Sequence, residues 1–322
     1  MKRVMFVGLW ISLCVLAACS SHKSEDDAQT LYSGNIRIAV DESLRPIMEE
    51  ELQVYTALNP EAVVTPVYCS EVEAVNLLMK DSVRLAVTNR ALTERELQSF
   101  HTRKFFPESV RMAVSGLALI VNRQNPDSLL TVDQFRRVLL GEVTRWEQLN
   151  PDSRLGELQL VFDNPNSGTV RFAIDSICKG QPIASAVKAQ RTNEAVIRYV
   201  SETPGAIGVI GVNWIGNDAD STRLSFNQSV RVMAVSADTA ETTGDACRPY
   251  QAYLALRKYP LTHDVYILIN DPRGALPTGL MTFLTGDRGQ RIILKSGLVP
   301  ATQPVRLVDV KDDLSPRKMM KE

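Results

Sequence analysis

The pattern of apolar and polar residues predicts strands that alternate with helices along the first third of the chain. Apolar and polar residues alternate over 36–40, as in a strand, and apolar residues recur with helical spacing over 46–58. The same pattern predicts strands over 63–68 and 84–88, with a helix over 71–79 between them. This order is typical of a parallel sheet with crossover helices.

A second set of elements follows with the same character. Residues 114–121 form an apolar run long enough for a buried strand, and 131–140 have the spacing of a helix that Gly141 ends. A strand is predicted over 158–162 and a helix over 170–178. The fold class is therefore α/β, and ligands of such sheets bind beyond the carboxyl ends of the strands.

Length and charge narrow the class of protein. The chain has 322 residues, and at roughly 150 residues per domain this length favours two domains. The 36 basic and 37 acidic residues nearly cancel, and the net charge of −1 gives no reason to expect a nucleic-acid partner. Any bound anion must therefore be captured by local geometry rather than by the field of the whole protein.

The N-terminus has the features of an export signal. Two basic residues at positions 2 and 3 precede an apolar run over 4–18 that is shorter than the roughly 20 residues a membrane-spanning helix needs. The run ends in small residues before Cys19, which resembles the lipobox of bacterial lipoproteins. We expect a signal peptide over 1–18, a lipid on Cys19, a polar tether over 19–34 and a place in the bacterial envelope. The alternative is an ordinary signal or anchor with a buried cysteine.

The residues that could do chemistry are few. Beyond the N-terminal segment the chain has three cysteines, Cys69, Cys178 and Cys247, and none of them forms a CxxC motif. They could form one disulfide, or all three could be buried free thiols. The chain has 3 His and no Gly-x-Ser-x-Gly or His-Glu-x-x-His motif. We therefore predict no catalytic residue, no metal and no cofactor.

A turn with anion-binding character follows the strand over 158–162. Ser167, Gly168 and Thr169 stand directly before the next helix, where hydroxyls and free backbone N–H groups meet the positive end of the helix dipole. Arg171 could add a bidentate charge. The alternative is an ordinary capped turn.

The order of these segments resembles that of the phosphate-binding substrate-binding proteins of ABC transporters, within the two-domain (type II) periplasmic-binding-protein family. The matching stretches run in order from residue 36 to residue 300. They are 84–97, 114–149, Ser167-Gly168-Thr169 with Phe172, 204–208, 259–262, Gly289-Gln290 and 297–300.

The resemblance implies two α/β domains joined by two crossing segments, with a ligand cleft between them. The crossings fall near 111–122 and 256–269. The first domain would comprise 35–113 and 262–322, and the second 114–261. The implied function is to bind a small oxyanion, most simply phosphate, as a monomer and to deliver it to a membrane permease.

Several departures from the family pattern bear on the ligand. Asp41-Glu42-Ser43-Leu44 stands where the family has a Gly-Ser-Thr loop, so Ser43 alone keeps a comparable hydroxyl. Asp163 and Pro165 replace an Arg and an Asp before the Ser-Gly-Thr, and a further site Asp is absent, with Arg84 near its place. An acceptor carboxylate is what distinguishes protonated phosphate from sulfate, so phosphate selectivity does not follow from the resemblance alone.

The candidate ligand-binding residues come from three loops, and two aspartates are added as possible acceptors. Arg90 could alternatively pair with Glu94, and Arg171 could face solvent. The predicted set is Ser43, Thr88, Asn89, Arg90, Ser167, Gly168, Thr169 and Arg171, with Asp41 and Asp163. A second function stays open for the same fold: an envelope lipoprotein that acts as a sensor or attachment module with another ligand.

Overall fold

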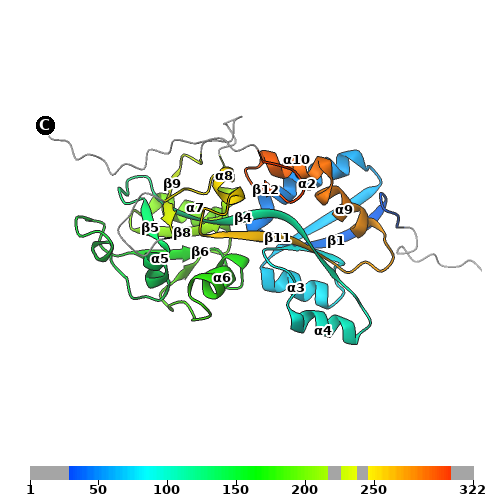
Figure 1. The fold of residues 1–322 in the computed structure, drawn as a ribbon, viewed down its shortest axis with the longest axis horizontal. Helices are drawn as coiled ribbons and strands as arrows, with labels where there is room; N and C mark the ends of the chain where they lie inside the picture. Colours follow the sequence, from blue (N-terminus) through cyan, green and yellow to red (C-terminus); the bar gives the residue numbers. More distant parts are fainter. Residues whose placement is uncertain (1–28, 217–225, 238–245, 306–322) are drawn as a thin grey trace, which may run out of the picture.

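The computed structural model describes residues 29–216, 226–237 and 246–305, which form two lobes joined by two long strands (Figure 1). The predicted signal peptide, Cys19 and most of the predicted tether lie outside the described residues. Among the residues that are described, no helix combines the length and the apolar character needed to cross a membrane.

The first lobe begins with the predicted strand–helix alternation. Strand β1 pairs in parallel with β2 on one side and β3 on the other. Ile38 and Val40 of β1 are fully buried, because the strand lies inside the sheet with helices on its faces. The elements are β1 (Gly34–Asp41), the 3-10 turn η2 (Glu42–Leu44), α2 (Arg45–Leu58), β2 (Ala62–Cys69), α3 (Glu71–Met79), β3 (Leu85–Thr88) and α4 (Glu94–Thr102).

Strand β4 (Glu108–Asn122) passes from one lobe to the other. Residues 108–116 pair antiparallel with β11 (Thr262–Ile269), and residues 117–121 pair antiparallel with β8 (Ala206–Gly211). The sheet is therefore mixed, because these crossing strands add antiparallel pairs to the parallel pairs predicted from sequence. Both strands run through the middle of the molecule in Figure 1.

The second lobe holds the predicted strand and helix on either side of the Ser-Gly-Thr turn. The predicted helix over 170–178 begins two residues earlier and continues as a π-helical turn. The elements are β5 (Leu129–Thr131), α5 (Val132–Leu139), η3 (Trp146–Gln148), β6 (Gln159–Phe162), α6 (Gly168–Phe172), the π turn η4 (Ala173–Ile177), β7 (Lys188–Ala189), α7 (Asn193–Glu202), η5 (Val212–Trp214), β9 (Val230–Val232), β10 (Ala234–Ser236) and α8 (Gln251–Ala255).

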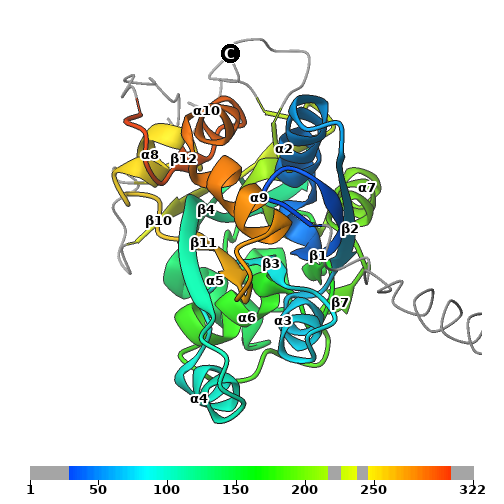
Figure 2. The same ribbon diagram turned by 90° about the vertical axis from the view of Figure 1, so that its right-hand side faces the viewer.

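After β11 the chain stays with the first lobe. Helices α9 (Leu276–Thr285) and α10 (Asp287–Lys295) lie beside α2, and β12 (Val299–Pro300) pairs with β4 (Figure 2). The buried amide of Gln290 donates to the backbone oxygen of Met112 at 3.0 Å, which ties α10 to the crossing strand. The first lobe is therefore built from two separate stretches of chain.

Two of the three cysteines that follow the tether do not pair with each other. Cys69 and Cys178 are free thiols in different lobes, and Cys178 is buried. Burial raises the pKa of the Cys69 thiol to about 12, which keeps it protonated and unreactive at neutral pH.

Candidate functional site

The loops after β1, β3 and β6 meet where the two lobes touch, together with the first residues of α3 and α6. The structure thus brings together the predicted candidates from both lobes. Asp41, Ser43, Thr88, Asn89, Asp163, Ser167, Gly168 and Thr169 are all buried there, and Arg90 and Arg171 are partly buried at the edge.

The Ser-Gly-Thr turn caps helix α6, but its hydroxyls face a carboxylate of its own lobe. Ser167 Oγ accepts the Val170 backbone N–H at 3.3 Å and donates to Asp163 Oδ1 at 2.7 Å. Thr169 Oγ1 donates to the same oxygen at 2.6 Å. Asp163 is 1% exposed, and burial raises its pKa. In this state the hydroxyl donors of the turn are already satisfied.

Gly168 lies directly on the contact between the lobes. Its backbone N–H donates to Asp41 Oδ2 at 3.1 Å. A β-carbon at this position would lie 2.6 Å from Asn89 Nδ2, 2.8 Å from Glu71 Oε2 and 3.0 Å from Asp41 Oδ2. Three polar groups of the first lobe therefore converge on a space that only glycine leaves open.

Glu71, the first residue of α3, was not predicted as a site residue. It is 1% exposed, its Oε2 accepts the Asn89 backbone N–H at 3.0 Å, and its Oε1 accepts from Arg171 Nε of the second lobe. Arg171 also donates to the Asn89 backbone oxygen at 3.2 Å. Acidic residues are common in the first turn of a helix, so the sequence alone could not indicate that Glu71 pairs with the opposite lobe.

Arg90 lies at the edge of the site in a bidentate ion pair. Its two terminal nitrogens each lie 2.8 Å from a Glu96 oxygen, and its Nε lies 3.5 Å from Glu71. The partner is therefore Glu96 of the α4 capping box rather than Glu94. The Thr88 hydroxyl is also engaged, since it donates to the Arg90 backbone oxygen at 2.8 Å.

Two further contacts cross between the lobes through residues that sequence reasoning missed. Asn193, at the start of α7, donates to Glu42 Oε2 at 2.6 Å and to Asp163 Oδ2 at 3.2 Å. Trp214 Nε1 donates to the Ser43 backbone oxygen at 2.9 Å. The lobes are thus closed on each other by direct hydrogen bonds.

Burial dominates the electrostatics of this contact. It raises the pKa of Asp41 to about 7, with a further contribution from the nearby Glu71 carboxylate, and it raises the pKa of Glu42. Asn89 Oδ1 is buried and accepts no hydrogen bond within the described part of the chain. The same part contains no cluster of three or more His, Cys, Asp or Glu side chains arranged to hold a metal.

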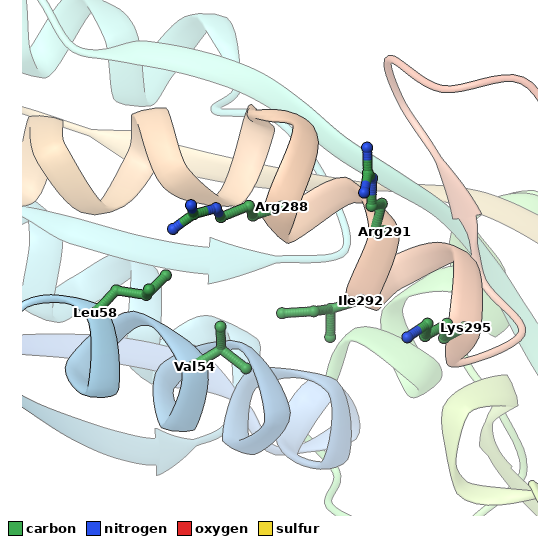
Figure 3. A pocket seen from close by; sticks show the side chains of 6 residues that line it. All are labelled: Val54, Leu58, Arg288, Arg291, Ile292 and Lys295. Carbon is green, nitrogen blue, oxygen red and sulfur yellow. The ribbon is translucent and has the colours of Figure 1, made fainter.

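A separate pocket lies on the outside of the first lobe, between α2 and α10. It has a volume of 360 Å³, an apolar base and a basic rim (Figure 3). Arg291 of this rim is held by Asp287 at 2.9 Å. The pocket is lined by Val54, Leu58, Arg288, Arg291, Ile292 and Lys295, and none of these residues belongs to the interlobe contact.

Two α/β lobes on a shared pair of crossing strands, with polar loops meeting between them, define a two-lobed solute-binding protein. A family model described as a PBP superfamily domain matches residues 25–288. The match covers most of the chain, so the chain belongs to the PBP superfamily, as its resemblance to the periplasmic binding proteins predicts.

Individual relatives match over nearly their whole length. The phosphate-binding protein PstS of Pseudomonas aeruginosa is 25% identical, with 97% of this chain and 98% of that protein aligned. PstS of Borreliella burgdorferi is 21% identical over 93% of this chain and 99% of its own. A solved ABC-type phosphate transport receptor from Vibrio cholerae aligns with a TM-score of 0.62 and 22% identity, over 83% of this chain and 100% of that one. This structural likeness confirms the two-domain fold.

Proposed function

We propose that this protein is the substrate-binding component of an ABC importer and that it receives phosphate between its lobes. The observation that carries the proposal is the Ser167-Gly168-Thr169 turn, at the start of α6 on the lobe contact, in a chain that aligns from end to end with proteins named as phosphate-binding. These relatives favour an importer component over a sensor or attachment module.

The site offers donors of the kinds that bind oxyanions. The Gly168 N–H, the hydroxyls of Ser167 and Thr169 and the guanidinium of Arg171 come from the second lobe. Ser43, whose hydroxyl accepts from Asn89 Nδ2 at 2.9 Å, comes from the first. Closure of the lobes around a ligand would collect these donors on one anion.

The remaining parts of the proposal concern the setting of the protein. Residues 35–113 and 262–322 would form the first domain, and 114–261 the second, in agreement with the pairing of β4 and β11. We propose export to the bacterial envelope with a lipid on Cys19, a monomeric binding protein, a permease as partner and no catalysis.

Thr169→Ala is expected to weaken phosphate binding by roughly ten- to a hundredfold, because a hydrogen bond to a charged group contributes about 1.5–3 kcal/mol. Isothermal titration of the purified protein, freed of ligand by unfolding and refolding, measures the change. Thr144→Ala is the matched control, since Thr144 is exposed in the same lobe and away from the turn. A wild-type protein that gives no heat with phosphate would overturn the proposed ligand.

Phosphate is expected to bind more tightly than sulfate. Asn89 Oδ1 is a buried acceptor without a partner in the described structure, and only a protonated oxyanion can donate to it. Parallel titrations with phosphate and sulfate at pH 6 and pH 8 test this preference. Equal affinities would show that Asn89 does not distinguish the two anions.

A further inference from the structure

The Glu71 carboxylate is bound as an oxyanion ligand would be. One oxygen accepts the Asn89 N–H at the end of β3, and the other accepts the Arg171 guanidinium from the opposite lobe. Backbone N–H groups and arginine are the groups with which proteins commonly hold carboxylates and phosphates. At 1% exposure, Glu71 is enclosed like a bound ligand rather than solvated like a surface glutamate.

We propose that Glu71 is an internal anion of the cleft, which holds the empty lobes closed on Arg171 and which an incoming oxyanion must displace. The inference rests on the proposed function, because it takes the ligand to be an oxyanion. The apparent affinity for the ligand is then set by its competition with the Glu71 carboxylate for Arg171.

The lobe contact itself joins acceptors of the first lobe to donors of the second. Asp41 accepts from Gly168 N at 3.1 Å, and Glu42 accepts from Asn193 Nδ2 at 2.6 Å. Glu71 likewise accepts a hydrogen bond from Arg171. Three carboxylates of the first lobe therefore accept hydrogen bonds from donors of the second lobe. A ligand is not needed to neutralise or bridge these groups.

The charges around Glu71 explain why an anion must replace it rather than bind beside it. Glu71 and Asp163 both lie close enough to Asp41 to raise the pKa of its carboxyl group. Of the two arginines beside Glu71, Arg90 lies 3.5 Å away and is also paired with Glu96, and Arg171 is also paired with Asp175 at 3.5 Å. A further anion next to these carboxylates would meet like charges in a buried site, where repulsion is strong. Release of Glu71 removes one of them and frees the guanidinium.

The test compares Glu71→Gln with the wild type. Glutamine keeps the shape of the side chain and removes its charge, so the ion pair to Arg171 is lost. Without phosphate, the variant is expected to show a larger radius of gyration in small-angle X-ray scattering and a red-shifted emission of Trp214, which hydrogen-bonds across the lobes. With phosphate, it is expected to bind about tenfold more tightly than the wild type.

Asp175→Asn is the matched control. It also removes a carboxylate from Arg171, but this carboxylate belongs to the second lobe and is 58% exposed, so lobe closure should not change. Arg171→Gln breaks the same interlobe ion pair from the other side and should open the cleft while weakening phosphate binding. This second variant decides the question if Glu71→Gln does not fold.

The outcomes separate the two proposals. A Glu71→Gln protein that keeps both the wild-type radius of gyration and the wild-type phosphate affinity overturns the role of Glu71. If the variant opens but neither it nor the wild type binds phosphate, the role of Glu71 in closure stands and the proposed ligand fails.

Discussion

Replacing Gly168 with alanine is expected to weaken phosphate binding by about a hundredfold or more, because the closed state would become a minor one. The added methyl group would lie within 3.0 Å of Asn89 Nδ2, Glu71 Oε2 and Asp41 Oδ2. These atoms cannot easily move, since each side chain is buried and hydrogen-bonded on the first lobe. The lobes would therefore have to separate, and the donors of the two lobes would no longer reach one anion.

Titration with phosphate and scattering without it measure the two effects of Gly168→Ala. Thermal unfolding is the internal control: the conflict lies between the lobes and not inside the core of either one, so the variant should still unfold as a folded protein. A variant that binds phosphate like the wild type, with an unchanged radius of gyration, would show that the site tolerates a β-carbon.

The spacing of apolar residues along the chain predicted the strands and helices that position the site, because each of these elements is determined by residues close together in sequence. The alternation over 36–40 and the helical spacing over 46–58 correspond to β1 and α2, and the Ser-Gly-Thr turn lies at the start of α6 as expected. The end of a strand and the start of a helix are marked by neighbouring residues in sequence. For this reason the approximate location of the site could be predicted.

The partners of the site residues could not be predicted, because they are distant in the chain. Glu71 meets Arg171 across 100 positions, and Glu42 meets Asn193 across 151. No local pattern distinguishes a helix-starting glutamate that faces solvent from one that faces another lobe. Only the fold reveals which carboxylates are buried together.

Asp163 shows how one departure from the family pattern changes the site. In the family pattern an arginine precedes the Ser-Gly-Thr and contributes a donor, whereas Asp163 accepts from Ser167 and Thr169. The hydroxyl groups of the turn are therefore satisfied within their own lobe. Binding of an anion would require these hydroxyls to reorient, or Asp163 to take up a proton, which its raised pKa favours.

The second prediction with a large expected effect concerns the stability of the fold. It involves Glu51 of α2, which is not part of the interlobe site. The residue is fully buried, and neither carboxylate oxygen has a hydrogen-bond partner in the described structure. Burial, with a smaller contribution from Glu50, raises its pKa to about 9. The side chain is therefore protonated in the folded protein at neutral pH, although it is ionised in the unfolded chain.

The direction of the pH dependence follows from this difference. Between the ordinary pKa of 4.5 and the raised value of about 9, the folded state holds one proton more than the unfolded state, so stability falls as pH rises. The slope is at most about 1.4 kcal/mol per pH unit for one group. Glu51→Gln removes this proton exchange. It is expected to be nearly as stable as the wild type at pH 5 and more stable by about 4 kcal/mol at pH 8, since the slope acts over three pH units.

Urea unfolding of both proteins at pH 5 and pH 8 measures this gain. Glu49→Gln is the matched control in the same helix, because Glu49 is half exposed and pairs with Arg45 at its surface. Loss of such a surface pair changes stability by at most about 1 kcal/mol. Stability curves for Glu51→Gln and the wild type that run parallel from pH 5 to pH 8 would mean that Glu51 is ionised in the folded protein and has found a partner there.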